Sequence, residues 1–355
     1  MASDNLKYYL RPTGLLSLDN GYSLCKRKQA ISINGLYFSS IELIERNLKE
    51  TKKTFFSIAD FFYKAASKFP DLLDVLLKKK KNILNNSQYV AKKNHLIFGI
   101  LNVTPDSFSD GGENFTLRNS LFNAKNLIDE GADFIDVGGE STRPGADEVN
   151  EADEILRVLP VIQALNNERI NLSLDSRNAS TMEMAILSGV KVVNDVSALK
   201  NNQKSAEIIK NYDVPLILMH MPGNPKNMMK NNNYIDVVLD VYDFLEERIK
   251  FCESVGIKRQ NLIIDPGIGF GKDYKQNLDL LRNLSIFHSL GCPIMLGVSR
   301  KRFISSITKE EIPKKRLSGT LAASVLALGQ GVQIHRVHDV KEINQAIKVF
   351  EKIIH

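Results

Sequence analysis

The chain has 355 residues, of which 43% are hydrophobic and 25% are charged, so it can bury a large core and is not expected to be disordered. It contains no run of about 18 apolar residues, which excludes a transmembrane helix, and its start has no basic segment followed by an apolar one, as a secretory signal would. Its three cysteines, Cys25, Cys252 and Cys292, are far apart and form no CxxC pair. This argues against a disulfide framework or a zinc site and predicts free thiols in the cytoplasm.

The formal net charge of +6 comes entirely from the first quarter of the chain. Residues 1–92 hold 16 Lys and Arg against 8 Asp and Glu, whereas the remainder has a slight acidic excess. Part of the basic excess is the run Lys78–Lys81, which is typical of a solvated helix end. No aromatic residues alternate with these basic ones, so we expect no nucleic-acid interface.

A small mixed α/β extension is expected in residues 1–92. Short strands are expected at Tyr8–Leu10 and Ala30–Leu36, followed by helices at Ser40–Glu50 and Thr54–Leu77. The last is a helix that Pro70 kinks or splits, and the Asn-rich stretch 82–94 is typical of a linker. The extension has no phosphate-binding loop, metal-ligand spacing or catalytic cluster, so the sequence assigns no chemistry to it.

From residue 95 to residue 355 a pattern of apolar strand and amphipathic helix repeats eight times. The expected strands are Leu96–Val103, Phe134–Gly138, Ile170–Asp175, Lys191–Val196, Pro215–His220, Asn261–Pro266, Pro293–Ser299 and Val332–Val337. The expected helices include Thr116–Glu130, Glu148–Leu165, Ala179–Ser188, Tyr234–Val255, Lys275–Leu290, Ser318–Gly329 and Val340–Ile354. Eight such units predict an α/β fold of the (β/α)8 TIM-barrel type. The alternative, a doubly wound open sheet, would more often carry a GxGxxG turn after its first strand, and none is present.

Polar residues recur where the expected strands end, about once per βα unit of roughly 34 residues. They are Asn102, Ser141, Asp175, Asn194, His220, Asp265, Lys301, Arg336 and His338. Any one of the Asp or Asn residues could simply cap the helix that follows. In a barrel, however, all these positions converge on the face where active sites lie, which favours a shared functional site.

Two long segments, residues 100–112 and 136–146, resemble the two signature motifs of dihydropteroate synthases. Five shorter segments resemble further motifs of that family in the same order, at residues 194–197, 218–221, 265–272, 299–301 and 336–339. The resemblance covers residues 95–355, and residues 1–92 lie outside it. It implies the condensation of 6-hydroxymethyl-7,8-dihydropterin pyrophosphate with p-aminobenzoate, which gives dihydropteroate and pyrophosphate in folate synthesis.

The resemblance implies three kinds of subsite. The pterin ring is implied to bind Asp175, Asn194, Met219, Asp265 and Lys301. The pyrophosphate is implied to bind Arg336, His338 and Asn102, of which Asn102 also contacts Mg²⁺ through its side-chain oxygen. Oxygen ligands and several retained waters suit magnesium.

Catalysis is expected to be electrostatic, with Lys301, Arg336, His338 and the loop carboxylate Asp110 as the participating groups. Because the aniline nitrogen of p-aminobenzoate is already nucleophilic, neither a triad nor a covalent intermediate is expected.

The p-aminobenzoate subsite is expected in two loops, residues 104–114 and 141–148, that order after pterin has bound. Its candidate residues are Phe108, Thr142, Arg143, Pro144, Phe270 and Arg302. Arg302 stands where some members of the family carry Ser, so the resemblance implies a sulfonamide target without fixing its sensitivity. Elsewhere Ser176 replaces a common Thr, Pro222 replaces a common Arg, and Asp273 replaces Thr as the expected N-cap of a helix.

Two alternatives to the synthase function belong to different classes: another enzyme and a non-enzymatic scaffold. A pterin-binding methyltransferase would share the barrel but has no pyrophosphate to hold, so Lys301, Arg336 and His338 argue against it. A non-enzymatic scaffold would have no need for the intact set of polar residues. The resemblance further implies a homodimer formed through late helices of the barrel, with small-molecule substrates and no membrane or nucleic-acid partner.

Overall fold

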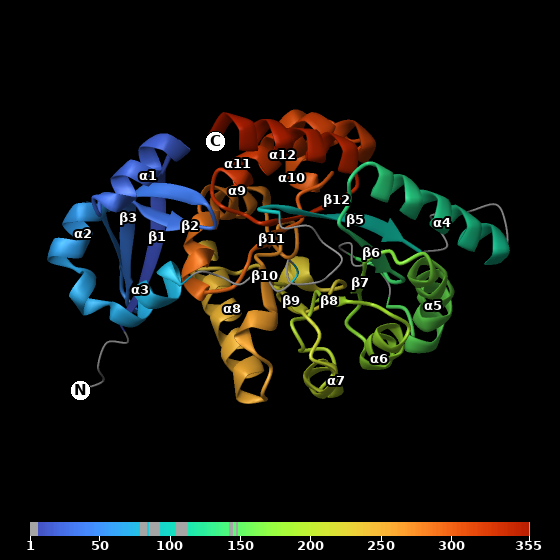
Figure 1. Cartoon of the computed structure of the whole chain (residues 1–355). Coiled ribbons are helices and arrows are strands. Elements are labelled where there is room, and N and C mark those ends of the chain that lie inside the picture. The colour runs from blue at the N-terminus through green and yellow to red at the C-terminus, as the bar shows by residue number, and fades with distance from the viewer. Residues whose placement is uncertain are drawn as a thin grey trace.

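The computed structural model describes residues 6–78, 84, 93–103, 113–141, 145–146 and 148–354. Figure 1 shows a large barrel of strands and helices with a small sheet beside it. The sheet is built from the N-terminal residues, and the C-terminal helix lies on the barrel. No helix of the described residues is long and apolar enough to cross a membrane.

The eight strands of the barrel run parallel in the order β10-β9-β8-β7-β6-β5-β12-β11. They are β5 (Leu96–Asn102), β6 (Phe134–Gly138), β7 (Leu172–Asp175), β8 (Val192–Asp195), β9 (Leu216–Met219), β10 (Leu262–Asp265), β11 (Met295–Leu296) and β12 (Ile334–Val337). A parallel bridge between Ile264 and Ile294 closes the ring. The expected (β/α)8 barrel is therefore confirmed, and the open sheet is excluded.

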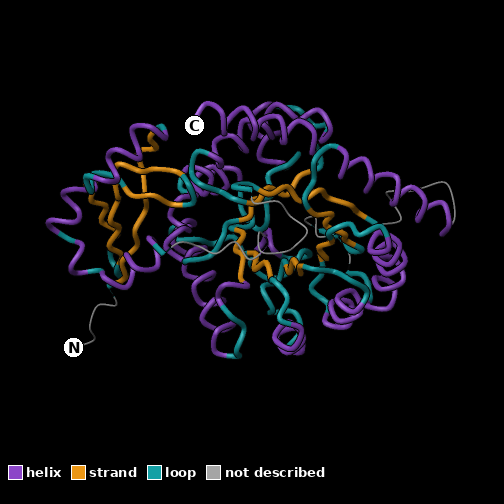
Figure 2. The backbone as a smooth tube through the Cα atoms, in the orientation of Figure 1, coloured by secondary structure: helices purple, strands orange, loops and turns teal. Residues whose placement is uncertain are grey.

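Helices surround the strands, as Figure 2 shows. They are α4 (Glu113–Asp129), α5 (Glu151–Asn167), α6 (Ala179–Leu187), α7 (Lys204–Tyr212), α8 (Val237–Ser254), α9 (Tyr274–Arg282), α10 (Arg302–Thr308), α11 (Leu317–Leu328) and α12 (Val340–Ile354). Short 3₁₀ helices occupy Met228–Lys230, Arg259–Asn261, Leu284–Leu290 (η6) and Pro313–Arg316. The repeat predicted a helix after β8 without giving its bounds, and α7 occupies that place, whereas α10 was not predicted. The single helix expected at Lys275–Leu290 is interrupted at Asn283. Asp273 caps α9 in a capping box with Gln276, as expected.

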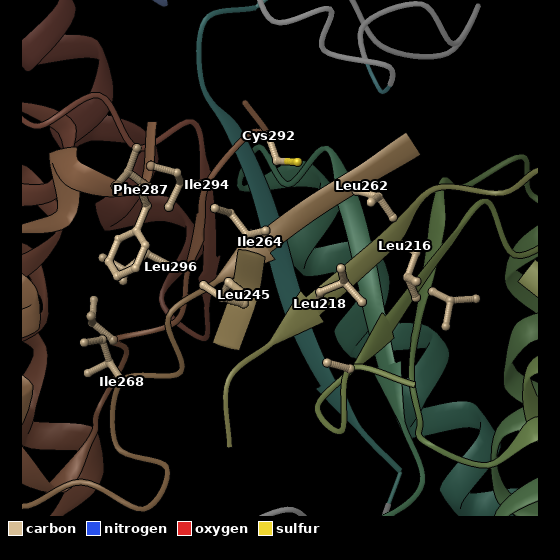
Figure 3. Packing of buried hydrophobic residues seen from close by; sticks show 14 of the residues in the cluster. Leu216, Leu218, Leu245, Leu262, Ile264, Ile268, Phe287, Cys292, Ile294 and Leu296 are labelled. Carbon is tan, nitrogen blue, oxygen red and sulfur yellow. The ribbon is translucent and has the colours of Figure 1, made fainter. Parts of the chain in front are cut away.

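The barrel has two apolar layers. One fills the space between strands and helices, and Figure 3 shows part of it around β9 and β10, including Leu218, Leu245 and Ile264. The other is a floor inside the barrel, formed by Leu84, Leu96, Phe98, Phe134, Val192, Ile217, Ile263, Met295 and Ile334. Phe98 and Phe134 stack there with ring centroids 4.7 Å apart.

Strand residues two apart share a face, so the residues two positions beyond the floor also point into the barrel. Most of these residues are polar, and they lie above the floor. Two residues beyond the floor level, five strands carry Asp136, Asp175, Asn194, Asp265 and Arg336. Each of the four Asp and Asn residues is at most 6% exposed. The carboxyl-terminal end of the barrel is therefore a buried polar layer on an apolar base.

The N-terminal residues form a four-stranded antiparallel sheet with helices. Its elements are β1 (Lys7–Leu16), α1 (Leu18–Lys26), β2 (Ile31–Ile33), β3 (Leu36–Arg46), β4 (Thr51–Ser57), α2 (Ile58–Lys64), a 3₁₀ turn (Ala66–Lys68) and α3 (Pro70–Leu77). The prediction of a helix at Ser40–Glu50 is wrong, because most of that segment belongs to β3. The helix expected from Thr54 starts only at Ile58, and Pro70 begins a new helix, so the expected split there is confirmed.

This sheet packs against the barrel through β1. Tyr9 is fully buried in the main core of the barrel, and its hydroxyl donates to Asp243 of α8 at 2.9 Å. Lys7 pairs with Asp243 at 2.7 Å, and Arg46 pairs with Asp240 at 2.6 Å. The two parts of the chain therefore share one buried interface.

Candidate active site

An arginine and two carboxylates form the centre of the polar layer. Arg336 of β12 donates from Nε to Asp136 Oδ2 and from Nη2 to Asp175 Oδ2, both at 2.6 Å. Burial opposes the charge of Arg336, but Asp136 and Asp175 outweigh it and raise the pKa of Arg336. The arrangement ties three strands together, and it leaves three of the five guanidinium N–H donors for other partners.

Asn194 joins this group through its amide, which donates to Asp136 Oδ2 at 3.2 Å. Asp136 was not among the predicted site residues, although it lies within the second motif. A signal existed, since a charged residue in the middle of the apolar strand Phe134–Gly138 is almost never buried without a partner. In the structure Asp136 is fully buried and bonds both Arg336 and Asn194.

Two carboxylate oxygens in the layer are available as acceptors. Asp136 Oδ1 and Asp175 Oδ1 are buried and have no hydrogen-bond partner among the described residues. Burial raises the pKa of Asp175 to about 7, although the charge of Arg336 lowers it. Because unpaired buried acceptors are costly, such oxygens fit a ligand that presents N–H donors.

Lys301 and Asp265 lie at the ends of neighbouring strands. Lys301 precedes α10, its Nζ donates to the carbonyl of Ile268, and it lies 4.5 Å from the centroid of the Phe270 ring. Burial lowers the pKa of Lys301 to about 8 against the opposing effect of Asp265. Asp265 accepts from the backbone N–H of Gly267 at 2.7 Å, and burial raises its pKa. The structure thus brings together Lys301 and Asp265, expected in the pterin subsite, and Phe270, expected in the p-aminobenzoate subsite.

Met219 ends β9 in a small apolar cluster. It packs with Val196, Met221 and Met228, and Phe270 lies against them. This cluster borders the polar layer, because Met219 is the inward residue two positions beyond Ile217 of the floor. It provides an apolar wall beside the hydrogen-bonding groups.

The remaining expected site residues are more scattered. His338 follows β12 and contacts Ser299 Oγ through Nδ1 at 3.0 Å. Asn102 ends β5 and is half-buried, whereas Arg302 is exposed at the start of α10. Five others lie outside the described residues: Phe108, Asp110, Thr142, Arg143 and Pro144.

Two further groups were not predicted. Buried Arg177, which follows β7, donates to Glu140 at 2.9 and 3.0 Å, and Glu140 accepts from the backbone of Val149. Buried Lys272, which ends the glycine-rich motif, contacts His220 Nδ1 at 2.9 Å. Each pair links two segments that follow neighbouring strands. The signal in the sequence was that Glu140 and Lys272 lie within segments that resemble family motifs.

A metal ion would find few ligands here. Within the described ranges, no three His, Cys, Asp or Glu side chains come together as a metal-binding group. Asn102 offers one amide oxygen at the end of β5. A single protein oxygen fits Mg²⁺, because this ion usually takes one or two protein oxygens and completes its shell with phosphate oxygens and water.

The eight-stranded barrel, with buried polar side chains at the carboxyl ends of its strands, has the architecture of a barrel enzyme. The sequence model described as "Pterin binding enzyme" matches residues 98–338. The dihydropteroate synthase of Bacillus subtilis (strain 168) is 42% identical over 264 residues, which are 74% of this chain and 90% of that protein.

Solved structures give the same result. Dihydropteroate synthase of Xanthomonas albilineans with 4-aminobenzoic acid has a TM-score of 0.69 and 42% identity, over 73% of this chain and 93% of that one. The Yersinia pestis enzyme, solved as a sulfonamide drug complex, has a TM-score of 0.69 and 40% identity. The match covers 73% of this chain and 94% of that one. The chain therefore belongs to the dihydropteroate synthase family of pterin binding enzymes, whose members are transferases.

Proposed function

We propose that the polar layer at the carboxyl end of the barrel carries out the dihydropteroate synthase reaction, in which 6-hydroxymethyl-7,8-dihydropterin pyrophosphate and p-aminobenzoate give 7,8-dihydropteroate and pyrophosphate. The observation that carries this assignment of residues is the Arg336 group. It presents two buried carboxylate oxygens, on Asp136 and Asp175, that have no partner among the described residues, together with further guanidinium donors. A ligand with N–H donors at one end and an anion at the other matches both.

The pterin ring is bound by short side chains on three strands, together with Lys301 and Met219. Asp175 and Asp265 accept its amino and ring N–H groups, while the amide of Asn194 bonds its edge. Lys301 reaches its carbonyl and N5 side, and Met219 packs on its face. The burial of the carboxylates supports this proposal, because an analogue without the N–H groups would leave a buried charge unpaired.

The pyrophosphate is held by Arg336 and His338, which lie two residues apart at the end of β12. Arg336 has donors to spare beyond its two carboxylate bonds, and the guanidinium fork suits phosphate oxygens. Asn102 would hold Mg²⁺ through its side-chain oxygen. The ion, when bound, supplies positive charge to the diphosphate oxygens.

The reaction starts when the bond between the pterin methylene carbon and the diphosphate oxygen breaks. The electron pair leaves with the pyrophosphate, and Arg336 and His338 stabilise the charge that develops on it. Asp110 stabilises the dihydropterin cation that remains. The aniline nitrogen of p-aminobenzoate then bonds to the methylene carbon and gives up one proton to solvent.

The p-aminobenzoate subsite combines Phe270 and Arg302 with four loop residues, Phe108, Thr142, Arg143 and Pro144. Phe270 supports this role because its ring already lies beside Lys301. Arg302 is exposed on the same loop-helix junction as Lys301, so its guanidinium is available to a carboxylate. The four loop residues enter the proposal on the family resemblance alone.

A homodimer and a cytoplasmic location complete the proposal. The exposed apolar residues Ile307, Val325 and Leu326 on α10 and α11 support association through late helices. None of the three cysteines, all of which the structure describes, forms a disulfide, which suits a reducing compartment. Light scattering should give twice the chain mass of 39.9 kDa.

The test of function is a measurement of pyrophosphate and dihydropteroate from the two substrates with Mg²⁺. We expect equal amounts of both products. Methyl transfer without pyrophosphate release would instead identify the methyltransferase, and pterin binding without any turnover would identify a scaffold.

A further inference from the structure

Lys272 is a buried lysine that none of the roles above uses. It is 3% exposed and comes one residue after the glycine-rich turn that follows β10. Its Nζ lies 2.9 Å from each of three polar atoms: Nδ1 of His220 and the carbonyl oxygens of Gly267 and Phe270. Burial lowers the pKa of Lys272 well below its usual value. An ammonium would donate to all three partners, and a neutral amine would donate to the two carbonyls and accept from His220 Nδ1, so these partners satisfy either form.

His220 shares a hydrogen bond with Lys272 through its ring Nδ1. Its pKa is held well below the usual value, first by burial and then by the charge of Lys272. Its ring is fixed by Phe244, at 4.8 Å between centroids, and by Tyr234, at 5.9 Å. Lys272 therefore links a rigid residue at the end of β9 to both ends of the turn at 267–270.

The backbone of this turn is closely packed and held by hydrogen bonds. Gly267 has a φ of +68°, and a Cβ there would lie 2.0 Å from the carbonyl oxygen of His220. The N–H of Gly269 donates to Asn277 Oδ1 at 2.6 Å, which fixes the outer side of the turn. Lys272 provides the corresponding bonds on the inner side.

The opposite face of the same turn meets the pterin-binding groups. Its Ile268 carbonyl accepts from Lys301, its Phe270 ring lies against the Lys301 ammonium, and its Gly267 N–H donates to Asp265. A displacement of the turn would thus move an acceptor of Lys301 and a donor to Asp265 at the same time.

We propose that Lys272 is a positioning residue for pterin binding: it fixes the 267–270 turn against His220, and the turn in turn orients Lys301 and Asp265. The inference rests on the proposed pterin-binding roles of those two residues. Lys272 itself does not touch the substrate in this account.

The test compares Lys272→Met with Lys275→Met, a change of the same kind at an exposed lysine of α9. We expect Lys272→Met to raise both the Kd of 6-hydroxymethyl-7,8-dihydropterin, measured by calorimetry, and the KM of its pyrophosphate about tenfold or more, as a misplaced binding group does. The kcat should change much less, and Lys275→Met should behave as the wild type. Unchanged pterin affinity in a folded Lys272→Met protein would overturn the proposal.

A double variant separates positioning from a general loss of structure. In a Lys301→Met background, Lys272→Met should weaken pterin binding by much less than it does in the wild type, because the group it orients is gone. Full additivity would contradict the proposal. If Lys272→Met does not fold, His220→Leu, which removes one partner of the link, should raise the same Kd, and an unchanged Kd there would equally overturn it.

The proposed function and this inference fail in different ways. A wild-type protein that binds no dihydropterin and makes no dihydropteroate would refute the proposed function. A wild-type protein that does both, beside a Lys272→Met protein with the same Kd and KM, would refute only the role of Lys272.

Discussion

At the scale of single residues, the site places buried charges of opposite sign next to one another. Arg336 neutralises Asp136 and Asp175, and Lys301 faces Asp265. The net charge of +6 has no part in this, because the basic excess belongs to residues 1–92. An anionic substrate is therefore recognised by placed groups in a nearly neutral barrel, and not by bulk charge.

Removal of Arg336 should affect both turnover and stability. Arg336→Met takes away the donors proposed for pyrophosphate, so we expect kcat to fall about 100-fold or more. It also leaves Asp136 and Asp175 buried without a cation, which should lower the free energy of unfolding by about 3–5 kcal/mol. Pyrophosphate release and urea unfolding measure the two effects. Arg282→Met, at an exposed arginine of α9, is the matched control.

One outcome would contradict the proposed role of Arg336 in binding pyrophosphate. If Arg336→Met loses stability but keeps full turnover, Arg336 only holds the two carboxylates, and the anion role belongs elsewhere. Adding Asp136→Asn to Arg336→Met should recover part of the lost stability, because one buried charge has been removed.

The pH dependence of activity should show the titration of Lys301. Burial lowers its pKa to about 8, so the ammonium is present below that pH and is lost above it. We expect kcat/KM for the pterin substrate to fall as pH rises through about 8. Lys301→Arg keeps a positive charge at higher pH and should flatten this limb, whatever its effect on the absolute rate. A limb that is identical in Lys301→Arg would assign the titration to another group.

At the scale of elements, the turn after β10 depends on glycine at one position. Gly267→Ala places a methyl group 2.0 Å from the carbonyl oxygen of His220. We expect it to lower the free energy of unfolding by about 1–3 kcal/mol, through backbone strain, and to raise the pterin KM. Gly35→Ala is a matched control, because Gly35 has a φ of +83° and no atom within 4 Å of its Cβ position. Equal effects of the two changes would show that crowding at Gly267 is unimportant.

The barrel strands could be predicted because parallel buried strands are continuous apolar runs bounded by turns. The segment Ser40–Glu50 could not, since its apolar residues Ile41, Ile44 and Leu48 also match a helical face. Pairing with β1 on one side and with β2 and β4 on the other decides in favour of a strand. Glu42 is buried within it because Arg11 of β1 pairs with it at 2.5 Å.

The same distinction applies to the site. Asp175, Asn194, Asp265 and Arg336 could be predicted because they come at strand ends, where barrel sites form. Asp136 lies inside a strand and Lys272 beyond a turn, so only the fold shows what they contact. Residues whose role is to hold other residues leave a weaker signal in sequence than those at a strand end.

At the scale of the whole molecule, the extension is part of the barrel's packing. Its β1 lies on η6, where Ser285 donates to the carbonyl of Pro12 at 2.8 Å. Tyr9 meets Tyr242 of α8 edge to face, with centroids 5.0 Å apart, and α12 contributes Phe350 and Ile354 to the extension's own core. All seven residues of η6 are buried beneath or beside this contact. The extension therefore covers a surface that includes α8, which leads into the strand that carries Asp265.

This shared interface predicts that the full chain unfolds as one cooperative unit. Tyr9→Ala removes a fully buried ring from the joint core and leaves Asp243 without that donor, so we expect the free energy of unfolding to fall by about 3–5 kcal/mol. Calorimetry should show a single transition, and heat inactivation of the transferase should move with it to lower temperature. Tyr22→Ala, at a half-exposed ring of α1, should move neither. Two separate transitions, with the catalytic one unmoved in Tyr9→Ala, would show that the extension folds beside the barrel without supporting it.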